Sequence, residues 1–140
     1  MKKRVLFLCV ANSARSQMAE GLLKFLDKED RFEVFSAGSK PSKLNPYAIK
    51  VLDEIGIDIS SHHSKHWKEL DSEEGFDFVI SVCSDSEAEC PVFTGEVGQR
   101  LRWVFDDPAD CIDKKNCTEK FRIIRDRIKA RVINWLETGS

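Results

Sequence analysis

Residues 4–26 read RVLFLCVANSARSQMAEGLLKFL, and this segment determines the architecture expected for the chain. It begins with a short apolar run, Arg4–Leu8, which is typical of a buried strand. The loop Cys9–Arg15 follows it. Apolar side chains then recur at helical spacing over Gln17–Leu26, with Ser16 as the predicted N-cap. The loop therefore lies between the carboxyl end of a strand and the start of a helix.

The rest of the chain continues this alternation of strands and helices. Strands are expected at Phe32–Phe35, Phe76–Val82 and Leu101–Phe105, and helices from Asn45-Pro46 to Gly56 and from Asn116 or Thr118 to about Thr138. Such alternation is typical of a parallel sheet covered on both faces. We predict an α/β fold, a single domain over residues 1–140 with a four-stranded parallel sheet flanked by helices on both faces. Ligands of such sheets bind beyond the carboxyl ends of the strands, where Cys9–Arg15 lies.

Length and charge narrow the class of protein. The chain has 140 residues, with 22 Lys+Arg against 24 Asp+Glu and a formal net charge of −2. It fits one domain and carries no basic excess for nucleic acid. The longest apolar run, Val5–Ala11, is far shorter than the roughly 20 residues that span a bilayer, and its abrupt end does not suit a secretory signal. We expect a cytoplasmic monomer without membrane or nucleic-acid partners.

The segment Cys9–Ser16 has the pattern C-x5-R-S, which suits nucleophilic attack on an oxyanion. A curled loop of this length directs backbone N–H groups at one anion, backed by the positive end of the following helix. Arg15 can donate two hydrogen bonds to two of the anion's oxygens. The same field favours the Cys9 thiolate, and Ser16 can donate to its sulfur. The residues expected to bind the oxyanion are Val10, Ala11, Asn12, Ser13, Ala14 and Arg15.

This pattern leaves two alternatives open. Phosphate and arsenate are both tetrahedral oxyanions, so the loop does not distinguish them. The competing structural interpretation is a core cysteine at a strand end with an arginine nearby by chance.

Asp106-Asp107-Pro108 follow the last expected strand and should lie at the same end of the sheet as the cysteine loop. A carboxylic acid there can protonate a leaving oxygen, so Asp107 is the predicted general acid. The alternative is a solvated turn, because Asp and Pro are common turn residues.

Cys83 and Cys90 flank a polar stretch beyond the third expected strand. If that stretch is helical, the two Cα atoms lie roughly 10 Å apart, whereas a disulfide tolerates about 7 Å or less. A bond between them then requires the turn to unwind, which suits a reversible switch. Two unrelated thiols are the alternative.

The other cysteines and the histidines lie in polar segments, 109–117 and 62–70, which we expect to be surface loops. Cys111 and Cys117 are interpreted as incidental thiols, with an extra redox pair as the alternative. His62, His63 and His66 have no cysteine or acidic partner near them in sequence, so we expect a solvated loop and no metal site.

Residues 9–21, CVANSARSQMAEG, resemble the active-site signature of arsenate reductases built on the low-molecular-weight tyrosine phosphatase fold. The resemblance spans nearly the whole chain and is closest to the thioredoxin-coupled branch, which has three redox cysteines in this arrangement. It continues through Ser36-Ala37-Gly38, Asn45-Pro46, residues 56–60, the cysteine pair and residues 105–108.

The resemblance implies a three-cysteine relay. Cys9 attacks arsenate held by the loop backbone and Arg15, while Asp107 protonates the departing oxygen. Cys83 then attacks Cys9, an electron pair passes to arsenic, and arsenite leaves. Cys90 attacks Cys83, and the resulting disulfide is presented to thioredoxin or a similar dithiol. The implied role is arsenic detoxification without a bound cofactor.

One departure from the family concerns a cation. Asn12, Glu20 and Ser36 match residues that hold potassium in some relatives, whereas Lys65 falls where those relatives have an acidic residue. The resemblance therefore implies an ammonium group in place of the cation.

Two other functions compete with arsenate reduction. A phosphotyrosine phosphatase acting through a Cys9 phosphocysteine needs only Cys9, Arg15 and Asp107. However, Ala109 follows Asp-Pro where tyrosine phosphatases of this fold have an aromatic residue. An oxyanion or arsenite sensor would use the thiols only to bind, but the chain has no DNA-binding helix pattern or basic patch.

Overall fold

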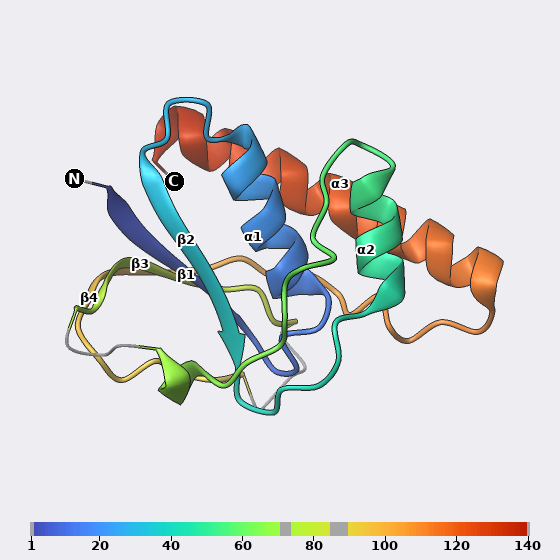
Figure 1. The fold of residues 1–140 in the computed structure, drawn as a ribbon, viewed down its shortest axis with the longest axis horizontal. Helices are drawn as coiled ribbons and strands as arrows, with labels where there is room; N and C mark the ends of the chain where they lie inside the picture. Colours follow the sequence, from blue (N-terminus) through green and yellow to red (C-terminus); the bar gives the residue numbers. More distant parts are fainter. Residues whose placement is uncertain (1, 71–73, 85–89, 140) are drawn as a thin grey trace.

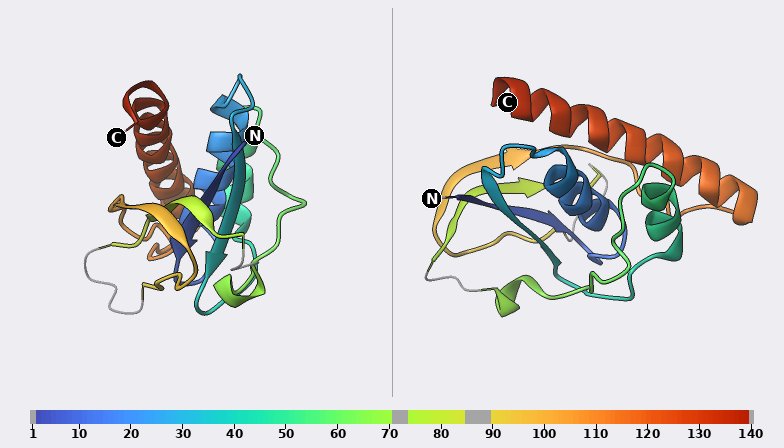
Figure 2. Two further views of the ribbon diagram at one scale, coloured as in Figure 1. Left: turned by 90° about the vertical axis from the view of Figure 1, so that its left-hand side faces the viewer. Right: turned by 45° about the horizontal axis from the view of Figure 1, so that its top comes forward.

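The computed structural model of the chain describes residues 2–70, 74–84 and 90–139. Its centre is a four-stranded, all-parallel sheet with the strand order β2-β1-β3-β4 (Figure 1, Figure 2). The predicted α/β class and strand direction are confirmed. The strand order reverses at β1, so the loop after β1 lies at the switch point where such sheets bind ligands. The strands are β1 (Lys3–Cys9), β2 (Phe32–Gly38), β3 (Phe76–Ser81) and β4 (Val97–Arg102).

The two faces of the sheet have different covers. Three α-helices, α1 (Arg15–Leu26), α2 (Pro46–Asp53) and α3 (Lys114–Thr138), bury side chains in one cluster with Val5, Phe7 and Cys9 of β1. The opposite face buries Leu6 and Leu8 against Phe93 and Trp67, and the helical turn there is the 3₁₀ turn η1 (Trp67–Glu69). Cys9 therefore faces the helical layer. In the described part of the chain, no helix is long and apolar enough to cross a membrane.

The last strand lies earlier than predicted. β4 covers Val97–Arg102, whereas the apolar pattern predicted Leu101–Phe105. β4 is an edge strand whose side chains are mostly exposed, so it has little apolar signal. Trp103 and Phe105 are buried beyond its end, and Trp103 N still donates to Ser81 O at 2.8 Å.

The first residues of the three α-helices can be compared with the predicted N-caps. α2 begins as predicted, because Asn45 Oδ1 accepts a hydrogen bond from Tyr47 N at 2.8 Å and Pro46 is the first helical residue. The other two predictions are wrong. α1 begins at Arg15, so Ser16 is its second residue, and Ala14 precedes the helix without a side-chain cap. α3 begins at Lys114, capped by Asp113, whose Oδ1 accepts from Asn116 N at 2.8 Å.

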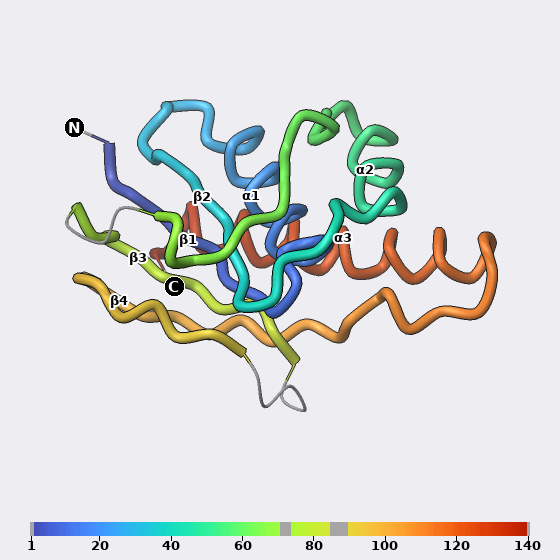
Figure 3. Tube along the Cα trace, turned by 60° about the horizontal axis from the view of Figure 1, so that its bottom comes forward, coloured from blue at the N-terminus to red at the C-terminus, as the bar shows by residue number. Residues whose placement is uncertain are grey.

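Beyond β4, the chain runs back along the sheet toward the start of α3 and passes the loop that follows β1 (Figure 3). Arg15 Nη1 donates to Phe105 O at 3.0 Å, which joins these two segments directly. The predicted meeting of the cysteine loop and the Asp-Pro segment at one end of the sheet follows from this path.

Candidate active site

The backbone of the loop after β1 is fixed through its carbonyl groups. Each carbonyl accepts a hydrogen bond from a residue outside the segment 10–13: Val10 O from Ser39 N and Lys40 N, Ala11 O from Ser42 N and Ser64 Oγ, Asn12 O from Gln17 Nε2, and Ser13 O from Asn45 N. In a trans peptide, the C=O and the following N–H point in opposite directions, and the described chain has no cis peptide. The N–H groups of residues 11–14 are therefore directed to the inner side of the curl.

Cys9 lies at the centre of this curl. Its sulfur accepts a hydrogen bond from Asn12 N at 3.3 Å and lies 2.8 Å from Ser16 Oγ. Asn12 Nδ2, which can only donate, also lies 2.8 Å from Ser16 Oγ. The Ser16 hydroxyl accepts that bond, so its one proton remains for the Cys9 sulfur. The network thus supplies two hydrogen-bond donors to the sulfur.

Asn12 positions the curl itself. Its φ of 50° lies in the left-handed region, which asparagine tolerates better than most residues. Its side chain is fully buried, and Oδ1 accepts from Lys65 N at 3.0 Å and from Gln17 Nε2 at 3.1 Å. Hydrogen bonds from α1 and from the segment 62–66 therefore hold Asn12 in this left-handed conformation.

Arg15 and Asp107 meet beside the loop. The Arg15 guanidinium is buried, and its Nη2 lies 3.8 Å from Asp107 Oδ2. The Asp107 side chain is half exposed, at 49%, and its Oδ1 accepts from Ala109 N at 3.0 Å. A solvent-accessible carboxyl next to a buried guanidinium suits proton transfer to a departing oxygen at the mouth of the loop.

Cys83 lies past the end of β3, which neighbours β1. The β1–β3 ladder continues with Val82 N donating to Leu8 O at 2.8 Å, and buried Cys83 belongs to the same core cluster as Cys9. Cys83 is bonded to Cys90, with 6.1 Å between the Cα atoms, whereas Cys9 is a free cysteine. The separation is therefore shorter than a helical turn would give. The intervening residues 85–89, predicted to unwind, lie outside the described residues.

The interpretation of Cys111 and Cys117 as incidental thiols is wrong. They form a second disulfide, with 5.1 Å between the Cα atoms. The sequence spacing alone did not show that the start of α3 turns Cys117 back toward the preceding loop.

The segment 62–66 contacts the loop instead of lying free in solvent. Gln17 Oε1 lies 3.1 Å from His62 Nδ1, and Ser64 and Lys65 bond the loop as described above. Burial lowers the pKa of His62 below its usual value. The three histidines do not converge: His62 contacts Gln17, His63 offers its carbonyl to Gln17, and His66 Nδ1 caps η1. The spacing of the histidines gives no signal for these contacts, because the contacts join segments that are distant in sequence.

Of the residues compared with a potassium site, Glu20 and Ser36 bond each other, whereas Asn12 bonds Ser16, Gln17 and Lys65. Glu20 is buried. Its Oε1 accepts from Ser36 Oγ and its Oε2 lies 2.6 Å from Lys24 Nζ. Lys65 Nζ donates to His63 O at 3.2 Å, and burial lowers its pKa against the opposing effect of the Glu20 carboxylate. The ammonium bound to Glu20 is therefore that of Lys24, not the expected Lys65.

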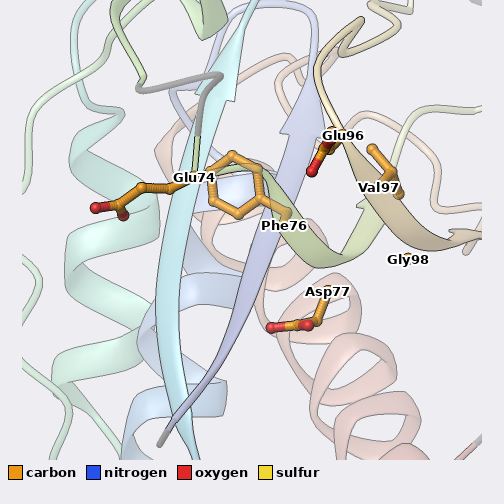
Figure 4. A pocket seen from close by; sticks show the side chains of 6 residues that line it. All are labelled: Glu74, Phe76, Asp77, Glu96, Val97 and Gly98. Atoms are coloured by element: carbon orange, nitrogen blue, oxygen red, sulfur yellow. The ribbon is translucent and has the colours of Figure 1, made fainter.

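A separate pocket lies at the amino ends of β3 and β4, away from the cysteine loop (Figure 4). Three of its six lining residues are acidic: it is lined by Glu74, Phe76, Asp77, Glu96, Val97 and Gly98. Asp77 accepts a hydrogen bond from Arg4 N, and Glu74 pairs with the Arg4 guanidinium. This pocket offers no donors for an oxyanion comparable with those around Cys9.

Comparison with known proteins agrees with this site. The family model "Low molecular weight phosphotyrosine protein phosphatase" matches residues 4–139. An arsenate reductase of Shouchella clausii is 42% identical over 139 residues, covering 99% of this chain and 98% of the relative. A solved arsenate reductase in its oxidised state is 34% identical with a TM-score of 0.78, and 99% of each chain is covered.

A thioredoxin-dependent arsenate reductase of Corynebacterium glutamicum is 28% identical with a TM-score of 0.70, and the match covers 98% of this chain and 61% of that one. The chain belongs to the low molecular weight phosphotyrosine protein phosphatase family, in the group of its arsenate reductases.

Proposed function

We propose that the protein reduces arsenate to arsenite through Cys9, Cys83 and Cys90, and that a thioredoxin-class dithiol regenerates it. The observation that carries the proposal is the Cys83–Cys90 disulfide, formed while Cys9 is free at the end of the neighbouring strand. That arrangement is the expected product of one relay cycle. Relatives of this chain are arsenate reductases, and one is thioredoxin-dependent.

The cycle begins with arsenate bound by the inward N–H groups and Arg15. The Cys9 thiolate attacks arsenic, an As–S bond forms, and Asp107 gives its proton to the oxygen that leaves as water. The Cys83 thiolate then attacks the Cys9 sulfur. The As–S bond breaks, its electron pair stays on arsenic, and arsenite leaves. Arsenic(V) accepts this pair readily and phosphorus(V) does not, so the thiols make a reductase of a phosphatase-like site.

The next step moves the oxidised bond away from the loop. Cys90 attacks the Cys83 sulfur of the Cys9–Cys83 disulfide, Cys9 leaves as thiolate, and the Cys83–Cys90 bond forms. Reduced thioredoxin takes over this disulfide and returns two thiols. Such a reductant implies a reducing compartment, so we propose the cytoplasm. All the residues involved come from one chain, so a monomer suffices.

One single-turnover experiment tests the relay. Reduced protein is mixed with arsenate, quenched by alkylation, and its cysteines are mapped by mass spectrometry. We expect one arsenite per protein and a Cys83–Cys90 disulfide. Arsenite release from protein in which Cys9, Cys83 and Cys90 are all found alkylated, and therefore still reduced, would contradict the relay.

Matched variants separate the roles of the cysteines. Cys83→Ser and Cys90→Ser should abolish multiple turnover of arsenate but spare hydrolysis of an aryl phosphate. Cys9→Ser should abolish both activities. Equal loss of both activities in Cys83→Ser would remove Cys83 from the relay, and activity retained in Cys9→Ser would remove Cys9 as nucleophile.

Aryl phosphate hydrolysis is the second candidate function. The family match and the Cys9, Arg15 and Asp107 arrangement favour it. Ala109, exposed after the Asp-Pro pair, provides no ring to pack on a phenyl group. We therefore propose hydrolysis as a side activity, weak beside arsenate reduction.

A further inference from the structure

The Cys111–Cys117 disulfide has no place in the proposed relay. However, Cys111 lies in the same segment as Asp107, residues 106–113, which we call the Asp107 loop. Its Cα separation of 5.1 Å is ordinary for a disulfide. It connects the segment after Pro108 to the first four residues of α3. That helix is well anchored, because Phe121 and Ile124 are buried in the main core cluster.

Little else holds this segment. Pro108 is buried, but no side chain from 109 to 116 is, and Ile112 is 89% exposed. Two exposed hydrogen bonds assist, from Lys120 Nζ to Asp110 O and from Ile112 N to Asn116 Oδ1, and Asp113 accepts from Asn116 N and Cys117 N at the cap of α3. All of these hydrogen bonds also lead to α3, so the covalent bond is the strongest of several parallel links between the Asp107 loop and this helix.

The two sulfurs are unequal in ways that favour directed exchange. Cys111 is partly exposed, whereas Cys117 is only 6% exposed. An incoming thiolate therefore reaches Cys111, and Cys117 is the leaving group. Cys117 lies in the first turn of α3, which has no acidic residue and contains Lys114 and Lys115. The positive helix end and these ammonium groups favour the departing thiolate, while the Asp113 carboxylate at the cap of the helix acts against it.

We propose that Cys111 and Cys117 form a second redox couple, separate from the relay, which exchanges with protein dithiols and whose disulfide form holds the Asp107 loop in place. In reduction, one thiolate of the dithiol attacks Cys111, the S–S bond breaks, and Cys117 leaves as thiolate and takes a proton. The second thiol attacks the mixed disulfide and releases Cys111, so the dithiol becomes a disulfide. Exchange with a low-molecular-weight disulfide reverses these steps.

The consequence for the site is a change in how firmly Asp107 is held. In the disulfide form, Asp107 lies within 3.8 Å of the Arg15 guanidinium although half of its side chain is exposed. Reduction removes the covalent link and leaves hydrogen bonds to α3, so local opening of the segment becomes easier. This consequence rests on the proposed role of Asp107, whereas the exchange of the couple itself does not.

The test uses the full chain carrying Cys83→Ser and Cys90→Ser, so that Cys111–Cys117 is the one native cysteine pair left beside Cys9. The protein is equilibrated in buffers with graded ratios of reduced to oxidised dithiothreitol, and then quenched and mapped by mass spectrometry. We expect the pair to cycle reversibly in the folded protein. A pair that is alkylated in every buffer, or that stays bonded under excess reductant until the protein unfolds, would overturn the proposal.

Hydrogen exchange provides the second readout. Amides of residues 106–113 should exchange about tenfold faster after reduction, because a short-loop disulfide contributes up to a few kcal/mol to local stability. The matched control adds Cys111→Ser and Cys117→Ser, and it should exchange fast in both buffers. Unchanged exchange on reduction of the native pair would refute the holding role.

Neither readout involves turnover, so both are independent of arsenate reduction. If the couple cycles but the wild-type chain forms no arsenite in the single-turnover experiment, the proposed function fails and the redox couple stands. Aryl phosphates then test the link to Asp107: reduction should slow hydrolysis of a poor leaving group more than that of a good one. Equal slowing of both substrates would show that the redox state of Cys111 and Cys117 does not act through Asp107.

Discussion

Ser16 is the residue whose single hydroxyl connects Asn12 of the loop to Cys9, the proposed nucleophile. It accepts a hydrogen bond from Asn12 Nδ2 and gives its proton to the Cys9 sulfur, both at 2.8 Å. A hydrogen bond to a charged group contributes about 1.5–3 kcal/mol, so Ser16→Ala should slow the reactions of Cys9 by about 10- to 100-fold.

Alkylation by iodoacetamide at neutral pH measures this in protein with Cys83→Ser and Cys90→Ser. Ser42→Ala is the control, because Ser42 contributes its backbone N–H to the loop and the side chain is exposed. An unchanged alkylation rate in Ser16→Ala would show that the hydroxyl does not act on the sulfur.

Gly38 is needed because there is no space for a side chain at this position. A Cβ there would lie 2.4 Å from Val10 O, 2.8 Å from Cys9 O and 3.0 Å from Asn12 N. All three atoms belong to the backbone of Cys9 and the loop after it, so this loop itself must move in Gly38→Ala. Because misplacement of reacting groups by about 1 Å can cost about 100-fold in rate, we expect a loss of that order in kcat/KM.

Gly21→Ala is the matched control for this prediction. Its Cβ would meet the side chain of Ile59 at 2.7 Å and that of Leu52 at 3.2 Å, away from the loop. It should lower the free energy of unfolding by about 1–3 kcal/mol with kcat/KM near the wild-type value. Similar losses of activity in both variants would mean that the Gly38 effect is only one of stability.

The elements that sequence predicts well are those whose signals are local. The apolar run of β1 and the Asn45-Pro46 start of α2 were placed correctly because a buried strand and a side-chain cap depend on neighbouring residues alone. β4 was misplaced because its edge position removes the apolar pattern, and its neighbours Trp103 and Phe105 are buried by tertiary packing.

The same distinction holds for the candidate site. The sequence predicts a role for the loop and for Asp107 because their residue types carry chemistry in a recognisable order, and the structure brings Arg15 of the loop and Asp107 together. It did not identify Gly38, Gln17 or the segment 62–66, whose roles arise from contacts between distant segments. Ser16 was predicted both as a donor to the Cys9 sulfur and as the N-cap of α1, and the cap is wrong because α1 already begins at Arg15.

The segment that contains His62 should make stability depend on pH. Gln17 Nε2 donates to the loop, so its Oε1 accepts from the protonated Nδ1 of His62. Burial lowers the pKa of His62 below the 6.5 of free histidine. Between these values the unfolded chain binds more protons than the folded one. Stability from this group is thus complete above pH 6.5 and is lost as the pH falls through the folded pKa.

His62→Gln keeps a polar partner for Gln17 and removes the titration. The difference in melting temperature between wild type and this variant should shift in favour of the variant as the pH falls below 6.5, and should be flat above it. Melting curves at closely spaced pH values measure the difference. A constant difference across the whole range would contradict the assignment.

The whole molecule is joined at a cluster of aromatic rings between α3 and the sheet. The Trp135 ring lies 5.0 Å from that of Phe32, 5.1 Å from that of Phe78 and 6.2 Å from that of Trp103. These residues come from β2, β3, the segment after β4 and the end of α3. Because they are distant in sequence, the cluster stabilises the closed arrangement of the entire chain and fixes the helix whose other end bears Cys117.

Two substitutions of Trp135 separate packing from polarity at this cluster. Its indole N–H is buried without a hydrogen-bond partner among the described residues. Trp135→Phe keeps a ring and removes that unpaired donor, so it should cost less than about 1.5 kcal/mol. Trp135→Ala should cost about 3–5 kcal/mol.

Urea unfolding followed by two probes measures both variants, with tryptophan fluorescence for the core and circular dichroism for the helices. If residues 1–140 form the single domain that their length predicts, the two transitions should coincide in the wild type and in both variants. Equal losses in Trp135→Phe and Trp135→Ala would show that the indole N–H matters more than the packing. Separate transitions would show that α3 unfolds apart from the sheet, and the Asp107 loop that is bonded to α3 would then be uncoupled from the cysteine loop before the core is lost.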